Sequence, residues 1–352
     1  MNEATFQPRS LLVTGGAGFI GANFIRHVLD THAPTRVINL DVLTYAGNLE
    51  NLAEYRDHPR HVFVKGDIAD FALVSRLLDE HAIDGVVHFA AESHVDRSIV
   101  GPAIFVQTNV AGTLSLLHAA KEYCARRTTR SDGFRFLQVG TDEVYGSLGA
   151  TGFFTERTPL DPHSPYSSSK AAADHLVSAY FHTFGLPTLI TRCSNNYGPY
   201  QFPEKMIPLM INNARHDKPL PVYGDGLNVR DWLYVIDHCT ALWGVLTRGQ
   251  IGNVYNIGGN NEKTNLEVVR SILKAIGKPE SLITYVKDRP GHDRRYAIDA
   301  KRIMSELGWK PSVTFEQGLA RTIEWYMAQQ AWLDRVTSGA YKNYYSSMYE
   351  NR

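Results

Sequence analysis

A tyrosine and a lysine lie one helical turn apart in a stretch with helical character. Tyr166 and Lys170 would project from the same face, because residues four apart are neighbours on a helix. An ammonium group beside a phenol stabilises the phenolate and lowers the pKa of the tyrosine. The pair therefore predicts a general base that takes the proton of an alcohol. The alternative is that a tyrosine and a lysine at this spacing occur in a helix by chance and have no catalytic role.

Two adjacent acids follow a predicted strand at residues 134–139. The run Thr141-Asp142-Glu143 places a hydroxyl and two carboxyls at the carboxyl end of this strand, where doubly wound sheets bind ligands. If burial and mutual repulsion separate the two pKa values, one carboxyl can act as an acid and the other as a base. The alternative is structural, with Asp142 capping the next turn and Glu143 exposed to solvent.

A glycine-rich turn indicates a dinucleotide site. Gly15, Gly18 and Gly21 follow the predicted strand 11–14 and open a predicted helix at residues 19–29. Glycine allows a sharp turn, a close approach of pyrophosphate to backbone N–H groups, and tight packing of helix on strand. Asp41 ends the second strand, twenty residues beyond Gly21. A carboxylate there accepts ribose hydroxyls and repels a 2′-phosphate, so the predicted cofactor is NAD rather than NADP.

Short apolar segments alternate with helix-length ones and must bring these residues together. Predicted strands at 11–14, 37–40, 62–64, 85–89, 134–139 and 187–191 are mostly separated by amphipathic stretches such as 71–81 and 104–125. This alternation predicts an α/β fold, a doubly wound parallel sheet of the Rossmann type. After residue 192, prolines at 199, 203, 208, 219 and 221 predict loops up to 229.

Helix 231–246 and strand 253–258 are expected to return to the main sheet. We predict a Rossmann domain over 1–191 and 229–258, with a smaller, discontinuous C-terminal substrate lobe over 192–228 and 259–352.

The composition excludes several classes of function. The chain has 352 residues, with 36 basic and 36 acidic side chains, so its formal charge is zero. Such a balance provides no long-range field for nucleic acid. Three cysteines, Cys124, Cys193 and Cys239, form no Cys-x-x-Cys pair, so no metal site is expected, and they are predicted to be buried thiols of a cytosolic protein. No membrane segment is expected.

Over nearly its whole length the chain resembles the extended short-chain dehydrogenases/reductases. The matching segments are 14–21, 40–48, 90–98, 141–146, 166–170, 194–208, 228–232 and 288–296. In this family the Thr-Asp-Glu run is typical of a nucleotide-sugar dehydratase. Related epimerases usually lack the acid pair, and related decarboxylases usually carry serine in place of the aspartate.

The resemblance implies an activity on dTDP-glucose with NAD bound throughout. Tyr166 and Lys170 would serve oxidation at C4, with Thr141 bonding the oxyanion. Glu143 would take the C5 proton and Asp142 would protonate the departing C6 hydroxyl, after which hydride returns to C6. The product would be dTDP-4-keto-6-deoxyglucose. A cytoplasmic homodimer is also implied. The alternatives are a UDP-sugar 4-epimerase or decarboxylase on the same scaffold, or a non-catalytic NAD-sensing protein.

The resemblance also implies two sets of binding residues. Those for NAD are the three glycines with Phe19, Ile20, Asp41, Thr44, Asp67, Ile68, Ala90, Ala91, Ser93, Thr108, Tyr166, Lys170 and Asn196. Those for the sugar nucleotide are Ser93, Thr141, Asn195, Lys205, Met206, Pro221, Tyr223, Arg230, Asn265, His292 and Tyr296.

Some of these residues have structural alternatives. Asp67 is either an adenine-side residue or an ordinary loop residue. Arg230 suits a diphosphate because guanidinium pairs with phosphate in a fork, but it could form a surface ion pair with Asp231. Lys205 suits the same diphosphate, and Tyr223 offers a face for a pyrimidine. His292 could simply be a turn residue.

Overall fold

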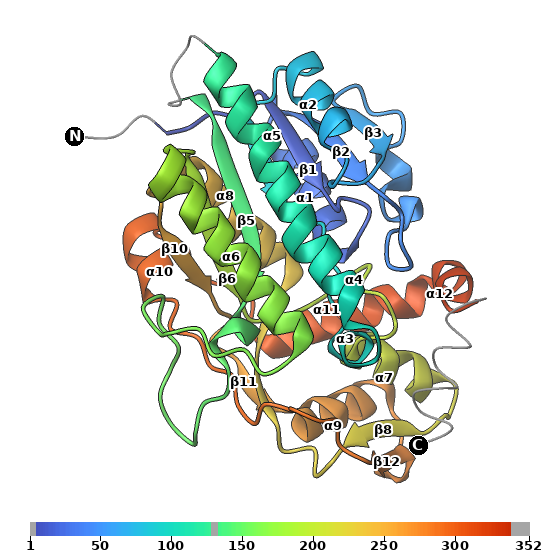
Figure 1. The fold of residues 1–352 in the computed structure, drawn as a ribbon. Coiled ribbons are helices and arrows are strands. Elements are labelled where there is room, and N and C mark those ends of the chain that lie inside the picture. Colours follow the sequence, from blue (N-terminus) through green and yellow to red (C-terminus); the bar gives the residue numbers. More distant parts are fainter. Residues whose placement is uncertain (1–4, 128–132, 339–352) are drawn as a thin grey trace.

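Seven parallel strands form the central sheet of the molecule. The computed structural model describes residues 5–127 and 133–338, and the strand order is β10-β6-β5-β4-β1-β2-β3 (Figure 1). The strands are β1 (Ser10–Thr14), β2 (Arg36–Asp41), β3 (His61–Lys65), β4 (Gly85–His88), β5 (Arg135–Thr141), β6 (Thr188–Cys193) and β10 (Val254–Ile257). Every neighbouring pair is parallel, so the carboxyl ends of all seven strands lie at one edge. The predicted doubly wound sheet is confirmed.

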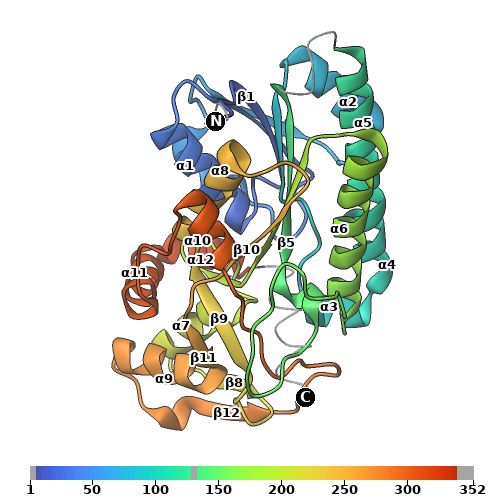
Figure 2. The same ribbon diagram turned by 90° about the vertical axis from the view of Figure 1, so that its left-hand side faces the viewer.

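Helices cover both faces of this sheet, as Figure 2 shows. One layer holds α1 (Phe19–Thr31), α8 (Val235–Arg248) and α10 (Lys301–Leu307); the other holds α2 (Phe71–Glu80), α5 (Thr113–Arg126) and α6 (Pro165–Phe184). Phe24 of α1 and Leu242 of α8 belong to the first buried core. Leu116 of α5 and Val177 of α6 belong to the second. Burying each such side chain stabilises the fold by about 1.5–3 kcal/mol.

A smaller assembly lies beyond the carboxyl edge of the large sheet (Figures 1 and 2). It contains a sheet of β7 (Asn195–Tyr197), β9 (Val229–Tyr234) and β11 (Glu262–Thr264), and a pair of β8 (Leu220–Tyr223) with β12 (Ile283–Val286). The accompanying helices are α7 (Met206–Arg215), α9 (Asn265–Ile276), α11 (Phe315–Ala328) and α12 (Gln330–Val336). Tyr197, Trp232 and Phe315 pack in its own core. This assembly forms the far wall of the sites described below.

The prediction of loops between 192 and 228 is wrong, because β7, α7 and β8 lie there. Pro208 is the third residue of α7, and a missing N–H costs little in the first turn of a helix. Pro221 lies in β8, which has β12 as its one partner in a two-stranded sheet.

Within the predicted segment 229–258, β10 is a strand of the large sheet and α8 packs against that sheet, whereas β9 pairs in the small sheet. Residues 339–352 of the predicted lobe lie outside the described residues. The division into two lobes stays a prediction.

Short helical segments complete the chain. They are η1 (Leu49–Tyr55), α3 (Val95–Val100), α4 (Pro102–Phe105), η2 (Val106–Gly112), η4 (Asp142–Tyr145) and η5 (Glu280–Leu282). The single helix predicted over 104–125 is therefore divided into α4, the wider turns of η2, and α5. In η2 the amide of Asn109 is buried, bonding Glu92 N–H and C=O and the hydroxyl of Ser169. In the sequence, Gly112 stands at the junction of η2 with α5.

Two further expectations concern the cysteines and the membrane. Cys193 and Cys239 are buried, but Cys124 is only partly buried at the margin of the α2/α5/α6 core, so the prediction for it is wrong. Across residues 5–127 and 133–338, the helices include none whose length and apolarity would suit a membrane span.

Candidate active site

The turn between β1 and α1 forms the floor of a cavity at the carboxyl edge of the sheet. Gly15 has φ of +70°, and a Cβ there would lie 2.6 Å from the backbone nitrogen of Ala90, so only glycine fits. A Cβ on Gly18 would meet only Gly15 O, at 3.3 Å. No side chain caps the N-terminus of α1. Its free N–H groups can therefore receive an anion such as a pyrophosphate.

Asp41 is held at the end of β2 by two backbone N–H groups. Its Oδ2 accepts a hydrogen bond from Ala17 N at 2.9 Å and its Oδ1 accepts one from Leu43 N at 2.8 Å. Burial raises the pKa of Asp41, and these two N–H groups oppose that rise. The carboxylate lines the same cavity as the glycines. An anion site on the helix and an oriented carboxylate one strand away fit the pyrophosphate and ribose of NAD.

The cavity has a volume of about 380 Å³ and brings together every residue predicted to contact NAD. These are Gly15, Gly18, Phe19, Ile20, Gly21, Asp41, Thr44, Asp67, Ile68, Ala90, Ala91, Ser93, Thr108, Tyr166, Lys170 and Asn196. Lining residues that sequence reasoning missed include Val42, Gly47, Gln201, Phe202 and Glu204. All of them lie in the segments 40–48 and 194–208 that carry the family resemblance, which was the available signal.

Tyr166 and Lys170 lie near the start of α6, whose N-terminus is firmly fixed. Ser164 and Ser167 form a capping box there, with Pro165 in the first turn. Both functional side chains are buried, and Lys170 Nζ donates to Val139 O at 2.8 Å. Burial first, and then the charge of Glu143, raise the pKa of Tyr166 well above its usual value.

The expected lowering of the Tyr166 pKa by Lys170 is therefore wrong, because the net shift of that pKa is upward. The ammonium is engaged by a strand carbonyl, and burial lowers the pKa of Lys170 itself.

The acid pair sits where β5 ends. Thr141 caps the turn η4 by accepting a hydrogen bond from Glu143 N at 3.3 Å. Asp142 is 1% exposed, and its Oδ2 has no hydrogen-bond partner among the described residues. Burial, followed by the charges of Glu143 and Asp231, raises the pKa of Asp142 well above its usual value. Burial and these two charges therefore favour the protonated form of Asp142.

Glu143 lies in a different electrostatic environment from its neighbour. Its side chain is half-buried, which raises its pKa, but the charges of Arg289, Lys205 and Arg230 all lower it. The pKa of Glu143 is still raised overall, but these three cations oppose the rise, whereas the charges of Glu143 and Asp231 add to the rise at Asp142. The two carboxyls suit the opposite roles of base and acid. The alternative of Asp142 as cap and Glu143 in solvent is wrong.

A second cavity, of about 160 Å³, adjoins the first. Glu143, Asn195, Glu204 and Lys205 line both. The predicted substrate residues lining the second cavity are Asn195, Lys205, Met206, Pro221, Tyr223, Arg230, Asn265 and His292. Ser93 and Thr141 line the first cavity instead. Tyr296 lines neither, because it is 3% exposed beneath Arg230, whose Cζ lies 4.3 Å from its ring centroid.

Arg230 is positioned by two backbone oxygens and an aromatic ring rather than by a surface acid. Its guanidinium donates to Val229 O at 2.7 Å and to Asp293 O at 2.9 Å. The neighbouring Asp231 accepts instead from Gly259 N and Asn261 N. The alternative of a surface ion pair with Asp231 is therefore wrong, and among residues 5–127 and 133–338 no carboxylate forms an ion pair with this guanidinium, which lines the cavity.

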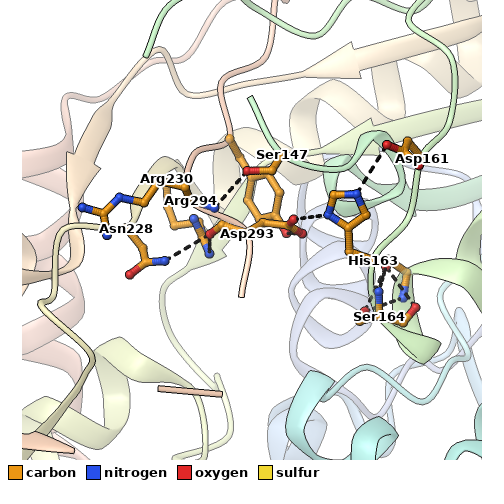
Figure 3. Close-up of polar contacts among 10 residues, drawn as sticks. Ser147, Asp161, His163, Ser164, Asn228, Arg230, Asp293 and Arg294 are labelled. Carbon is orange, nitrogen blue, oxygen red and sulfur yellow. Dashed lines mark hydrogen bonds and ion pairs between the residues drawn. The ribbon is translucent and has the colours of Figure 1, made fainter. Parts of the chain in front are cut away.

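The Asp293 side chain connects this region to the helix that carries Tyr166. Its Oδ1 lies 2.6 Å from Nδ1 of His163, directly before the cap of α6, and Asn228 Nδ2 donates to Asp293 O at 3.1 Å (Figure 3). The Tyr296 hydroxyl donates to its other carboxylate oxygen at 2.5 Å. The base-bearing helix and the Arg230 site are thus joined by direct contacts.

Other polar side chains complete the second cavity. His292 Nδ1 lies 2.6 Å from Asp288, and burial lowers the pKa of His292 to about 4, so the ring is neutral at pH 7. The Tyr223 hydroxyl donates to Asp96 at 3.1 Å, and its ring meets that of His292 edge-on. The cavity also contains Arg289, which the sequence predictions omitted although it lies in the segment 288–296.

Three comparisons place these observations among known proteins. The family model described as GDP-mannose 4,6 dehydratase matches residues 12–322. The chain is 60% identical over 341 residues to a dTDP-glucose 4,6-dehydratase of Xanthomonas campestris pv. campestris (strain B100), covering 94% of this chain and 97% of that one.

Two solved structures are similar to the whole fold. A dTDP-glucose 4,6-dehydratase of Bacillus anthracis str. Ames in complex with NAD is 52% identical, with a TM-score of 0.86, covering 93% of this chain and 99% of that one. The enzyme DesIV of Streptomyces venezuelae, with NAD and TYD bound, is 48% identical with a TM-score of 0.88 and the same coverage.

Proposed function

Because the chain belongs to the GDP-mannose 4,6-dehydratase family of extended short-chain dehydrogenases/reductases, we propose that it converts dTDP-glucose to dTDP-4-keto-6-deoxyglucose and water. The observation that carries this proposal is the acid pair. Asp142, whose pKa is raised by burial, and Glu143, which faces three cations, stand beside Tyr166, where the cavity that fits NAD meets the second cavity. Removal of water needs an acid and a base together, which this pair supplies.

Oxidation at C4 falls to Tyr166. When bound, NAD takes up a hydride from carbon and returns it later. Tyr166 reacts as a phenolate, after its own proton has passed to solvent, and its oxygen accepts the proton of the C4 hydroxyl. Lys170 positions the surrounding backbone through Val139 O. Thr141, whose hydroxyl lies at the end of β5 in the same cavity, donates to the developing C4 oxygen.

Elimination falls to the acid pair. A keto group at C4 acidifies the C5 proton, which a Glu143 oxygen removes. Asp142 gives its proton to the departing C6 hydroxyl, so that water rather than hydroxide leaves. Burial of Asp142 keeps that proton in place until it is needed. Glu143 then holds a proton at its carboxyl, available for C5 when carbon 6 is reduced.

Substrate binding falls to the second cavity. Arg230 and Lys205 are proposed to hold the diphosphate, since both present cationic groups there and the Arg230 guanidinium donates to the backbone oxygens of Val229 and Asp293. Tyr223 is proposed to stack on the pyrimidine. Tyr296 is proposed to support Arg230 from beneath rather than to touch the substrate.

The proposed assembly is a homodimer in the cytoplasm. The outer α3–α6 layer seen in Figure 2 exposes apolar side chains: Val100 at 82%, Ile104 at 51%, Val106 at 55% and Leu114 at 42%. A second copy would cover them. An Ile104→Glu substitution is expected to give monomers in sedimentation, and a monomeric wild type would refute this part. Cell fractionation tests the location.

Turnover with defined substrates tests the proposal against its alternatives. The protein is incubated with dTDP- and UDP-sugars and the products are weighed. We expect dTDP-glucose to lose the mass of one water. An unchanged mass with inverted C4 configuration would indicate an epimerase, loss of carbon dioxide a decarboxylase, and no turnover an NAD-sensing protein.

A further inference from the structure

Three chain segments meet at one wall of the cavity that fits NAD. The loop after β2 contributes Thr44 and Ala46, and the loop between β7 and α7 contributes Phe202 and Glu204. Between Thr44 and Ala46, the side chain of Tyr45 reaches the second loop and the third segment, helix α3. The first segment follows Asp41, whereas the other two flank the second cavity. These segments are far apart in sequence, so their contacts are purely tertiary.

Tyr45 contacts side chains of both neighbouring segments. The Arg97 guanidinium lies 3.9 Å from the centroid of the Tyr45 ring, and the Phe202 ring meets Tyr45 edge-on at 5.9 Å. Arg97 Nε also donates to Glu204 Oε2 at 3.0 Å. The Glu204 side chain is 1% exposed and that of Arg97 is 29% exposed. The Tyr45 hydroxyl is hydrogen-bonded to the same glutamate. One buried carboxylate thus joins the tyrosine and the arginine.

We propose that Tyr45, Arg97 and Glu204 form a latch that retains NAD between the two half-reactions. This inference rests on the proposed function, since only a hydride that leaves and returns requires the cofactor to stay. Because the latch joins the Asp41 side of the cavity to the side shared with the substrate, a dinucleotide spanning both cannot depart while it is closed. The three residues are positioning residues and touch no reacting atom.

The latch is unlike the contacts that build the core. Tyr45 and Arg97 are half-buried, and neither belongs to the apolar cores described above. Breaking their contact should leave the sheet and its helices intact. A partly buried cation–π contact and a hydrogen-bonded ion pair together justify an effect of at least about tenfold on the rate of NAD release.

The test measures cofactor retention directly. Tyr45→Ala and Arg97→Met each remove one side of the latch. Tyr285→Ala is the control, because it removes an exposed tyrosine of β12. The purified full-length variants are mixed with isotopically labelled NAD, and the rate of exchange is followed by mass spectrometry. We expect at least about tenfold faster exchange in both latch variants and the wild-type rate in Tyr285→Ala.

A second readout separates the latch from a loss of folding. With saturating NAD, the latch variants should remain folded, with a lower melting temperature in Arg97→Met because the buried Glu204 loses its ion-pair partner. They should keep the wild-type KM for dTDP-glucose, yet require added NAD for repeated turnover. If either variant folds poorly, Arg97→Lys decides, since it keeps the charge but loses the planar group that stacks on Tyr45. Wild-type exchange rates in the folded variants would overturn the proposal. A wild-type protein that does not dehydrate dTDP-glucose would instead refute the proposed function, which the exchange assay does not measure.

Discussion

Replacing Asp142 by asparagine should stop the reaction after its first half. Asn has nearly the same size and can accept the long contact of 3.4 Å from the Thr141 hydroxyl, but it has no proton to give. A general acid contributes about 10²–10⁴-fold, so elimination should slow by at least about 10²-fold, equivalent to about 2.7 kcal/mol. Oxidation at C4 should continue, because Tyr166 is unchanged.

The same substitution should not weaken the fold. Asp142 is 1% exposed and its pKa lies well above that of an unfolded aspartate, so the folded protein keeps a proton that the unfolded chain releases. Stability supplied by such a group falls as pH rises from the unfolded pKa toward the folded one. Asn removes this penalty, and Asp142→Asn should be at least as stable as wild type at pH 7.

Rapid mixing with dTDP-glucose measures both halves. We expect the absorbance of reduced nicotinamide to appear and persist in Asp142→Asn, while the product mass forms slowly. Asp57→Asn, an exposed aspartate outside both cavities, is the control. Wild-type product formation by Asp142→Asn, with intact melting behaviour, would refute the assignment of Asp142 as acid.

Four other changes test separate parts of the account. Glu143→Gln should lose solvent deuterium incorporation at C5, measured by mass spectrometry; normal exchange would assign the base elsewhere. Because the Tyr166 pKa is raised, the rate of C4 oxidation should increase with pH above neutrality in wild type, and Tyr166→Phe should show no oxidation at any pH. Asp41→Ala should retain at least about tenfold less NAD after gel filtration, since an oriented acceptor is lost; unchanged retention would contradict its role. The Asp293 contact raises the pKa of His163, so its stabilisation should be present below pH 6.5, the unfolded value, and lost as pH rises through the folded pKa; His163→Gln should remove this dependence of the melting temperature.

The catalytic edge was predictable because it depends on strand ends. The periodicity of the sequence indicated a parallel sheet. In such a sheet the residues that follow the strands lie at one edge, and these include the glycines after the first strand, Asp41 after the second and the acid pair after residue 139. The sequence analysis required different electrostatic surroundings for Asp142 and Glu143, and the cations that oppose the rise of the Glu143 pKa come from distant segments.

The rest depended on tertiary contacts that a sequence does not display. Prolines at 208 and 221 suggested loops, but their positions in a first helical turn and in a two-stranded sheet are compatible with regular structure. Lys170 was expected to lower the pKa of Tyr166, and its actual partner, the carbonyl of Val139, is a backbone group with no sequence signature. Tyr296 was assigned to the substrate, although its ring supports Arg230.

The fate of a single hydride tests the central claim most directly. dTDP-glucose labelled with deuterium at C4 is mixed with unlabelled substrate carrying a second isotopic mark, and the products are weighed after many turnovers. We predict that deuterium moves from C4 to C6 within the same molecule, with loss of one water and no added NAD. Extensive crossover of label between molecules, or product that retains its water, would contradict the account of a self-contained dehydratase.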